Sequence, residues 1–179
     1  MGERSLREVL AGDFARLRGR PPGAFGIARG FFDPRFCPVL LCRIGGALST
    51  AGWRRLSAPW FMLARVVFGL EVARQTRIGP GLVLPHANGV VIGASQVGSN
   101  ATIFQGVTLG AKDLDILFDP SKRPVLGAGV TVGAGAKVLG GITLGDGVTV
   151  GANAVVLEDV PAGCTVVGIP ARSVGESAS

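Results

Sequence analysis

The sequence has no tyrosine, a single histidine and only 6% aromatic residues among its 179 positions. Charged residues are also few, at 17%, whereas hydrophobic residues make up 47%, so the composition excludes a largely disordered chain. The three cysteines, Cys37, Cys42 and Cys164, show no metal-binding spacing, so we predict no metal site and a reducing compartment. The apolar run 60–70 is interrupted by Arg65 and is far shorter than the roughly 20 residues that cross a bilayer.

The few charges that are present are unbalanced, with a net charge of +6 and an isoelectric point of about 10.2. This bias favours anionic partners such as phosphates or a membrane surface, although a basic surface that only aids solubility has the same composition. We expect no nucleic-acid partner. The opening residues 1–20 are charged and contain no apolar stretch, which argues against a signal peptide and favours a cytoplasmic protein.

Apolar residues at helical spacing predict a helical N-terminal segment over residues 1–70. We expect helices over 3–18, 38–50 and 55–70, the last with Pro59 in its first turn, where proline is tolerated. The apolar third helix is best explained by packing on the rest of the chain or on a neighbouring subunit. Peripheral contact with a membrane is the alternative, because arginines lie beside its tryptophan and phenylalanine residues.

From about residue 71 onward an aliphatic residue returns at every sixth position, a period that no helix or ordinary strand has, with one extra residue between Val90 and Val97. This pattern is typical of hexapeptide β-helices, in which three hexads close one triangular coil around the aliphatic side chains. Roughly thirteen hexads predict about four coils. A sandwich rich in glycine and valine is the alternative. The repeating positions are Val72, Ile78, Leu84, Val90, Val97, Ile103, Leu109, Leu126, Val132, Val138, Leu144, Val150 and Val156.

The repeat is interrupted by the charged segment 111–124, which must leave the coil as a loop. An excursion of this length in a regular solenoid is more often functional than not, although a tolerated surface insertion has the same appearance. We therefore divide the chain into a helical segment at 1–70, a β-helix at 71–175 that contains this insert, and a tail at 176–179.

His86 is the only histidine of the chain and follows an inward-facing leucine by two residues. That offset predicts a place near a corner of the coil, facing outward toward other coils or subunits. Because an unperturbed imidazole is mostly neutral at pH 7 and can accept a proton, it is the natural general base. A surface histidine without a role is the alternative, and one histidine cannot build a metal site.

Residues 68–111, FGLEVARQTRIGPGLVLPHANGVVIGASQVGSNATIFQGVTLGA, and residues 132–172, ending in VVGIPAR, closely resemble the serine O-acetyltransferase family. They are also similar to O-acetyltransferases of bacterial exopolysaccharide and colanic acid gene clusters. The match covers about residues 38–175. It implies a left-handed parallel β-helix after a short α-helical part, a homotrimer, and acetyl-CoA as cosubstrate.

By this resemblance His86 matches the family's catalytic histidine, which deprotonates the acceptor hydroxyl as it attacks the thioester directly. Glu71 matches the acidic partner of that histidine. With a coil of about 18 residues Glu71 would lie beneath Gly89, three residues from His86, which supports the pairing independently. Cys164 lies far along the shaft without a base beside it, so we expect no covalent acyl-enzyme.

The resemblance also implies an acetyl-CoA groove along an edge between two subunits, where backbone groups hold the pantetheine arm. Lys137 and Arg172 are candidate contacts of the phosphate or adenine end, because charged side chains bind phosphate strongly. The small residues expected along the groove are Gly110, Ala111, Ala134, Ala136, Ala152 and Ala154.

Two departures from the family pattern concern the acceptor. Pro85 stands where the serine enzymes have an aspartate, and Arg123 where they have a second histidine. Proline cannot pair with an ammonium group and arginine repels one. We therefore predict an O-acetyltransferase that acts on a hydroxyl of a sugar, glycan precursor or other small metabolite. Serine O-acetyltransferase of cysteine biosynthesis is the second hypothesis, and a non-catalytic trimeric scaffold is the third.

Overall fold

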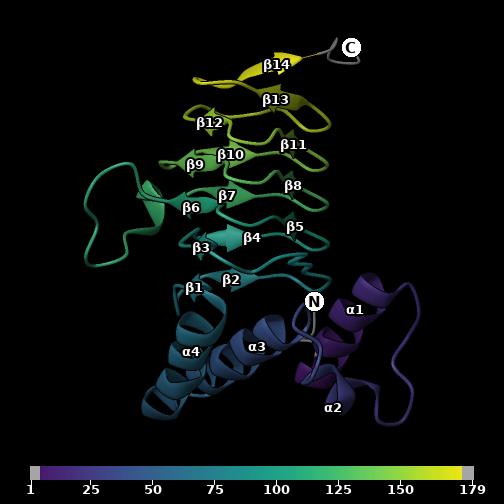
Figure 1. Cartoon of the computed structure of the whole chain (residues 1–179). Coiled ribbons are helices and arrows are strands. Elements are labelled where there is room, and N and C mark those ends of the chain that lie inside the picture. The colour runs from purple at the N-terminus through teal and green to yellow at the C-terminus, as the bar shows by residue number, and fades with distance from the viewer. Residues whose placement is uncertain (1–4, 175–179) are drawn as a thin grey trace.

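The computed structural model describes residues 5–174 and places a tall β-helix on a base of α-helices (Figure 1). A reciprocal cap between Ser5 and Glu8 starts the first helix, and Gly19, with a φ of 70°, ends it. Pro38 lies in the first turn of the third helix, where its missing N–H costs nothing. The helices are α1 (Leu6–Arg18), α2 (Gly26–Gly30), α3 (Cys37–Thr50) and α4 (Arg54–Phe68).

Helices α1, α3 and α4 correspond to the three that the sequence predicts, with ends that differ by at most three residues. The short α2 was missed, because five residues that include two glycines carry no helical period. Pro59 lies inside α4 and not in its first turn, since α4 begins at Arg54. None of the helices within residues 5–174 is both long and apolar enough to span a bilayer. The predicted tail, 176–179, lies outside the described residues.

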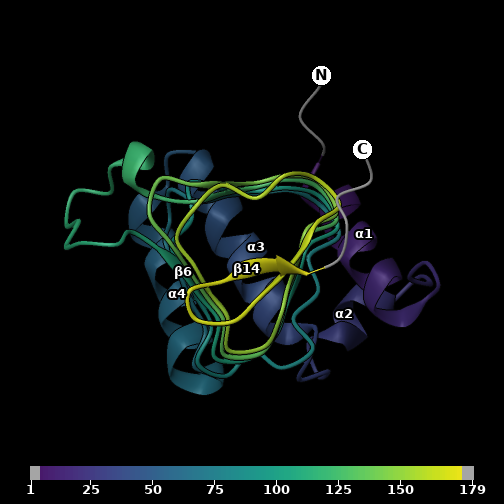
Figure 2. The ribbon, with the colours of Figure 1, turned by 90° about the horizontal axis from the view of Figure 1, so that it is seen from above.

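Above the base the chain winds into parallel sheets of two- and three-residue strands, and the coils superpose as a triangle when viewed along the shaft (Figure 2). Sheet A contains β1 (Glu71–Val72), β3 (Val91–Ile92), β6 (Thr108–Gly110), β9 (Lys137–Leu139) and β12 (Val155–Val156). Sheet B contains β2 (Arg77–Ile78), β4 (Gln96–Val97), β7 (Val125–Leu126) and β10 (Thr143–Leu144). Sheet C contains β5 (Thr102–Ile103), β8 (Thr131–Val132), β11 (Thr149–Val150), β13 (Thr165–Val167) and β14 (Arg172–Val174).

The predicted class, mainly β with parallel hexapeptide coils after a short helical part, is confirmed. The exception to parallel pairing is β14, which folds back antiparallel on β13 and closes the far end of the shaft. Eleven of the thirteen repeating aliphatic residues are no more than 2% exposed, and Val72 and Ile78, next to the base, are partly buried. Each such buried side chain contributes about 1.5–3 kcal/mol to folding. The shaft is therefore held together by aliphatic packing.

The first coil is longer than a regular one. Glu71 pairs with Val91, twenty residues further on, instead of the eighteen or so of a regular coil. The prediction that Glu71 lies beneath Gly89 is therefore wrong by two positions. The cause is the turn from Leu84 to Ile92, which spans eight residues where the coil above uses six. Sheet A also has five strands, so the shaft has five levels and not about four.

Candidate active site

His86 lies in the lengthened turn of the first coil, between Val83, which bridges to Thr102, and β3. Because this turn has two residues more than the one above it, its backbone bulges and the imidazole is exposed to solvent. The neighbouring Leu84 and Ala87 are buried and anchor the two ends of the bulge in the shaft. The sequence therefore correctly predicts an outward-facing corner for His86.

Backbone hydrogen bonds hold this turn from below and from above. The Gly89 N–H donates to the Gly69 carbonyl at 3.1 Å, and the Gly106 N–H donates to the Asn88 carbonyl at 3.0 Å. Gly89 has a φ of 70°, a conformation that favours glycine. The imidazole itself makes no hydrogen bond or ion pair with any residue from 5 to 174. Hydrogen bonds therefore fix the backbone of the turn but not the imidazole ring.

Glu71 begins β1 at the foot of this turn, and its N–H donates to the Val90 carbonyl at 2.9 Å. Its side chain is 52% exposed and lies 3.6 Å from Nε of Arg65 in α4. Among the described residues no hydrogen bond or ion pair joins Glu71 to His86. Exposed ion pairs contribute at most about 1 kcal/mol, so this carboxylate can change partner at little cost. Arg65 was missed by the sequence analysis, because nothing in its spacing from Glu71 across a helix end signals a contact.

A column of short turns continues upward from His86 along the corner between sheets C and A, and its upper two turns, 133–136 and 151–154, consist mainly of glycine and alanine. We call this the histidine corner, and its turns comprise residues 85–89, 104–107, 133–136 and 151–154. Successive turns are joined by backbone hydrogen bonds, such as the one from Asn153 N–H to the Ala134 carbonyl at 2.8 Å. Ala136 and Ala154 are completely buried, so their side chains cannot contact a ligand, whereas Ala134 and Ala152 reach the surface.

The insert 111–124 leaves from another corner, between sheets A and B, which we call the insert corner. Arg123 fixes it to the shaft, since Nε donates to Asp115 Oδ2 at 2.7 Å and Nη1 donates to the Gly93 carbonyl at 2.9 Å. The guanidinium also lies 4.1 Å from the ring centre of Phe118. The Arg123 side chain is only 13% exposed, so these contacts leave it little surface for a ligand.

Two carboxylates organise the insert around this arginine. The backbone N–H of Asp119 and the guanidinium of Arg123 donate to Asp115 and hold the pKa of its carboxyl below the usual value. Hydrogen bonds from Ser121 lower the pKa of Asp119 in the same way. The sequence analysis noted these charges without pairing them, although opposite charges eight residues apart in one short insert are a usable signal. The tip, with Leu114, Ile116 and Leu117, is exposed.

The remaining predicted groove residues are spread over the surface. Gly110 and Ala111 belong to the insert corner, where the insert starts. Lys137 lies on sheet A and donates to the Gly106 carbonyl in the histidine corner. Arg172 is exposed on β14 at the far end and donates to the carbonyl of the residue before it.

A single chain brings together only part of the predicted site. His86 and Pro85 precede β3 of sheet A, whereas Arg123 and the insert follow β6 of the same sheet, so the two groups lie at opposite ends of its strands. The two positions that concern the acceptor, Pro85 and Arg123, therefore do not lie together within one protomer. Chemically, the histidine corner offers an accessible base, a carboxylate at the start of β1, which pairs with β3 just after the turn of His86, and a column of short turns.

The thiols offer no competing nucleophile. Burial raises the pKa of Cys42 to about 12 against a smaller opposing effect of Arg43, and burial also raises the pKa of Cys37. Cys164 is partly exposed but lies in the last coil, far along the shaft from His86. The described cysteines therefore provide no candidate for a covalent acyl carrier.

Comparison with known proteins adds independent information. A family model for bacterial transferase hexapeptide (six repeats) matches residues 123–158. The serine acetyltransferase of Synechocystis is 44% identical over 171 residues, which cover 92% of this chain and 66% of that protein. That of Helicobacter pylori is 44% identical over 138 residues, covering 76% of this chain and 79% of that protein. The chain thus spans two thirds to four fifths of the length of these relatives.

Solved structures give the same result. Soybean serine acetyltransferase in complex with serine superposes with a TM-score of 0.83 at 34% identity, covering 96% of this chain and 70% of that one. A serine acetyltransferase in complex with CoA gives a TM-score of 0.80 at 31% identity, covering 95% and 70%. The predicted resemblance to serine O-acetyltransferases is confirmed. The predicted similarity to exopolysaccharide and colanic acid O-acetyltransferases finds no support in these matches.

Proposed function

This chain belongs to the serine acetyltransferase family, a family of acyltransferases, and from that premise we propose that it transfers the acetyl group of acetyl-CoA to the hydroxyl of serine. The observation that carries the proposal is a lone, accessible imidazole on a fixed backbone, in the turn that leads into the strand paired with Glu71. The relatives support serine, the second hypothesis of the sequence analysis, better than the sugar acceptor that it preferred.

In the proposed reaction His86 accepts the proton of the serine hydroxyl while the oxygen attacks the thioester carbonyl. The C–S bond then breaks, and His86 returns the proton to the departing thiolate, which leaves as free CoA. Glu71 exchanges Arg65 for the imidazole, which it orients and stabilises as an imidazolium. Backbone N–H groups of the histidine corner that make no bond within the chain would stabilise the negative charge that develops on the carbonyl oxygen.

We further propose that a homotrimer with left-handed coils completes the site. Since the histidine corner and the insert corner lie at opposite ends of the strands of sheet A, one chain cannot close a cleft with both. Seating the histidine corner of one protomer against the insert corner of the next makes a head-to-tail contact that closes into a ring. The contact would also cover the exposed apolar stripe of α4 beside Glu71, formed by Met62, Leu63, Val66 and Val67.

Acetyl-CoA is assigned to the groove at this contact. A relative that was solved with CoA supports the ligand. The glycines and alanines of the turns 133–136 and 151–154 support the place, because an extended pantetheine arm must approach the backbone closely. Ala134 and Ala152 would line it from one protomer, with Gly110 and Ala111 from the next. Lys137, beside this column, is the nearer candidate for a phosphate, and Arg172 is assigned to the adenine end.

A second candidate keeps the chemistry and changes the acceptor to a hydroxyl of a sugar or other small metabolite. Pro85, directly before His86, offers no charge to an ammonium group, which favours an acceptor without one. The matching objection from Arg123 is weaker than the sequence indicated, since Asp115 neutralises its charge at 2.7 Å. The case against serine therefore rests on Pro85.

The test is CoA release from acetyl-CoA with L-serine, with serine methyl ether as the control that lacks the attacking hydroxyl, and with a panel of sugars. We expect serine to be turned over with a kcat/KM of about 10⁴ M⁻¹s⁻¹ or more and at least about tenfold above any sugar. Turnover of a sugar without turnover of serine would establish the second candidate. No turnover of any acceptor, with His86→Ala equal to the wild type in every assay, would support the scaffold.

A further inference from the structure

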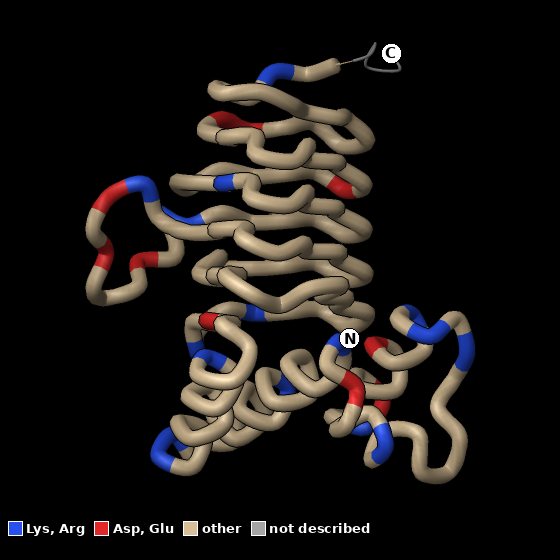
Figure 3. The backbone as a smooth tube through the Cα atoms, in the orientation of Figure 1, with Lys and Arg blue, Asp and Glu red and all other residues tan. Residues whose placement is uncertain are grey.

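The charges of the chain are divided unequally between its two parts. Residues 1–70 contain eleven arginines, no lysine and four acidic side chains, whereas residues 71–179 contain seven basic and eight acidic ones. Between residues 14 and 70 the one carboxylate side chain is that of Asp33, which is buried and paired with Arg18 and Arg35. Figure 3 shows basic positions on the helices beneath the shaft. The helical base is therefore strongly cationic, and the β-helix is close to neutral.

Part of this positive charge is not compensated within the chain. Besides Arg7 of α1, four exposed arginines of the base make no ion pair or hydrogen bond with any residue from 5 to 174. They come from the segment around α2 and from the start of α4, and they are Arg20, Arg29, Arg54 and Arg55. Such side chains are available to an anionic partner.

The same two segments expose large apolar side chains. Phe25 is 72% exposed and Phe32 is 86% exposed on either side of α2, and Trp53 is 61% and Leu56 51% exposed at the start of α4. Phe31, between Phe25 and Phe32, is 46% exposed. The whole chain has only eleven aromatic residues, and four exposed ones that each lie within four residues of an unpaired arginine are not the scatter expected of an ordinary surface.

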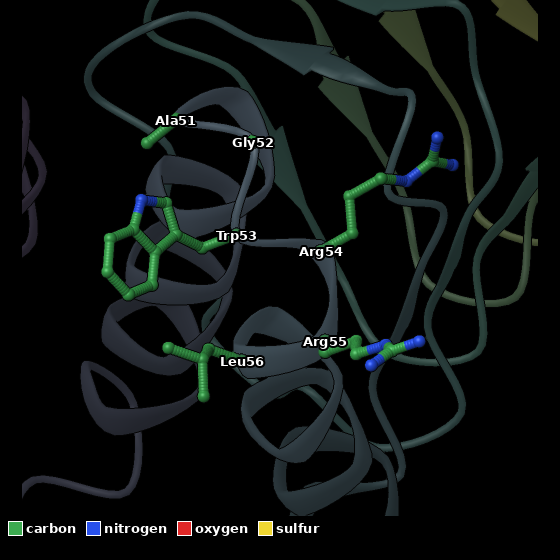
Figure 4. A pocket seen from close by; sticks show the side chains of 6 residues that line it. All are labelled: Ala51, Gly52, Trp53, Arg54, Arg55 and Leu56. Atoms are coloured by element: carbon green, nitrogen blue, oxygen red, sulfur yellow. The ribbon is translucent and has the colours of Figure 1, made fainter.

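The turn between α3 and α4 shows how these groups are arranged (Figure 4). Residues 51–56 line an open hollow of about 540 Å³. Trp53 and Leu56 project to one side of the turn, and Arg54 and Arg55 project to the other. An indole and a leucine beside two guanidinium groups is a combination suited to a boundary between water and an apolar phase.

We propose that these eight residues form a basal surface that docks the protein on an anionic lipid bilayer. The arginines would bind lipid phosphates, and the aromatic and leucine side chains would enter the boundary between headgroups and acyl chains. A single weak anchor gives only marginal membrane binding. Here each of two separate segments contributes both arginines and apolar side chains. Duplex nucleic acid would engage the arginines but leave the four apolar side chains in water, which favours lipid. The acetyl transfer at His86 does not require this surface.

The test is co-sedimentation of the full chain with vesicles of phosphatidylcholine alone and of phosphatidylcholine mixed with phosphatidylglycerol. We expect binding to the anionic vesicles, little binding to the neutral ones, and a strong decrease in salt of about 0.5 M, where charges are screened within a few ångströms. Phe25→Ser/Phe32→Ser and Arg54→Gln/Arg55→Gln should each weaken the partition about tenfold or more. All four side chains are exposed, so the variants should fold, which thermal unfolding checks.

The matched control is Leu114→Ser/Leu117→Ser, which removes two equally exposed apolar side chains from the insert, away from the base. It should bind vesicles like the wild type, and CoA release in solution should be unchanged in the basal variants. Equal binding to neutral and anionic vesicles, or wild-type binding by both basal variants, would overturn the proposal. It would also fail if the basal variants changed only the oligomeric state in light scattering, or only the binding of a DNA duplex.

Discussion

Asp13 of α1 and Arg43 of α3 form an ion pair of 2.8 Å in which the Asp13 side chain is 0% and the Arg43 side chain 10% exposed. Asp13 also accepts the N–H groups of residues 81 and 82, at 2.7 and 2.9 Å. Arg43 donates to the carbonyls of residues 78 and 79, both at 2.6 Å. The pair therefore binds the backbone of the first coil just before the turn that contains His86, and joins the base to the shaft.

Removing one member of this pair should be costly. Asp13→Ala leaves a buried guanidinium without its counter-ion, and we expect a loss of about 3–5 kcal/mol in the free energy of unfolding. Urea denaturation followed by circular dichroism measures it. The control is Asp113→Ala, which removes an exposed carboxylate from the insert and should change stability by no more than about 0.5 kcal/mol. Equal stability of the two variants would show that the pair is not what joins the base to the shaft.

The assignment of Gly110 to the acetyl-CoA groove can be tested without disturbing the fold. A Cβ at Gly110 would meet no atom of the chain within 4 Å, so Gly110→Ala should have the same free energy of unfolding as the wild type. If the pantetheine arm lies against this position, the added methyl group should raise the KM for acetyl-CoA about fivefold or more, the effect of a modest steric clash.

Gly46→Ala is the matched control, because a Cβ there also meets open space but on α3 of the base. It should leave the KM for acetyl-CoA unchanged and slightly stabilise the helix. A wild-type KM in Gly110→Ala would remove the insert corner from the acetyl-CoA site.

The sequence predicts those parts of the fold that depend on local, repeated patterns, and misses those that depend on contacts between residues far apart in the chain. Residues such as Ile103 and Leu126 can be recognised as core residues from the sequence, because each side of each coil places an inward-facing aliphatic residue at the same six-residue spacing. The lengthened turn before Ile92 defeats that rule, because two extra residues shift the register by an amount that the period does not reveal. The sequence also did not predict β14, because this strand pairs antiparallel to β13 and lies outside the six-residue repeat.

The candidate site was predictable only in part. His86 stands out as the sole histidine, and the turn that exposes it follows from its offset from a buried leucine. Three contacts depend on how separate elements meet in space: that of Arg123 with the Gly93 carbonyl, that of Glu71 with Arg65, and the ion pair between α1 and α3. No local pattern encodes such meetings, and the separation of Pro85 from Arg123 within one chain could not be predicted either.

The insert should respond to pH through Asp115. Its folded pKa is held below the usual value by the Asp119 N–H and by Arg123, so the stabilisation is complete above the unfolded pKa of about 3.9 and is lost as pH falls below it. We therefore expect the insert to be ordered from neutral pH down to about 4 and to loosen below that. Amide hydrogen exchange of residues 112–119 measures the change.

Asp115→Asn supplies the reference for that experiment. It removes the charge at every pH, so its insert should exchange fast already at neutral pH, whereas Asp113→Asn, which has no such contacts, should behave like the wild type. Slow exchange in Asp115→Asn at neutral pH would mean that the contact between Arg123 and the Gly93 carbonyl holds the insert alone.

The central claim, that His86 is the base of an acetyl transfer, is tested most directly by CoA release from acetyl-CoA and L-serine in His86→Ala. The side chain is exposed and makes no hydrogen bond or ion pair with the described residues, so the variant should fold normally, and Asn88→Ala serves as a control in the same turn. We predict that kcat falls about 10²-fold or more in His86→Ala, the usual contribution of a positioned base, and stays at the wild-type level in Asn88→Ala. A kcat within about twofold of the wild type in His86→Ala would contradict the account.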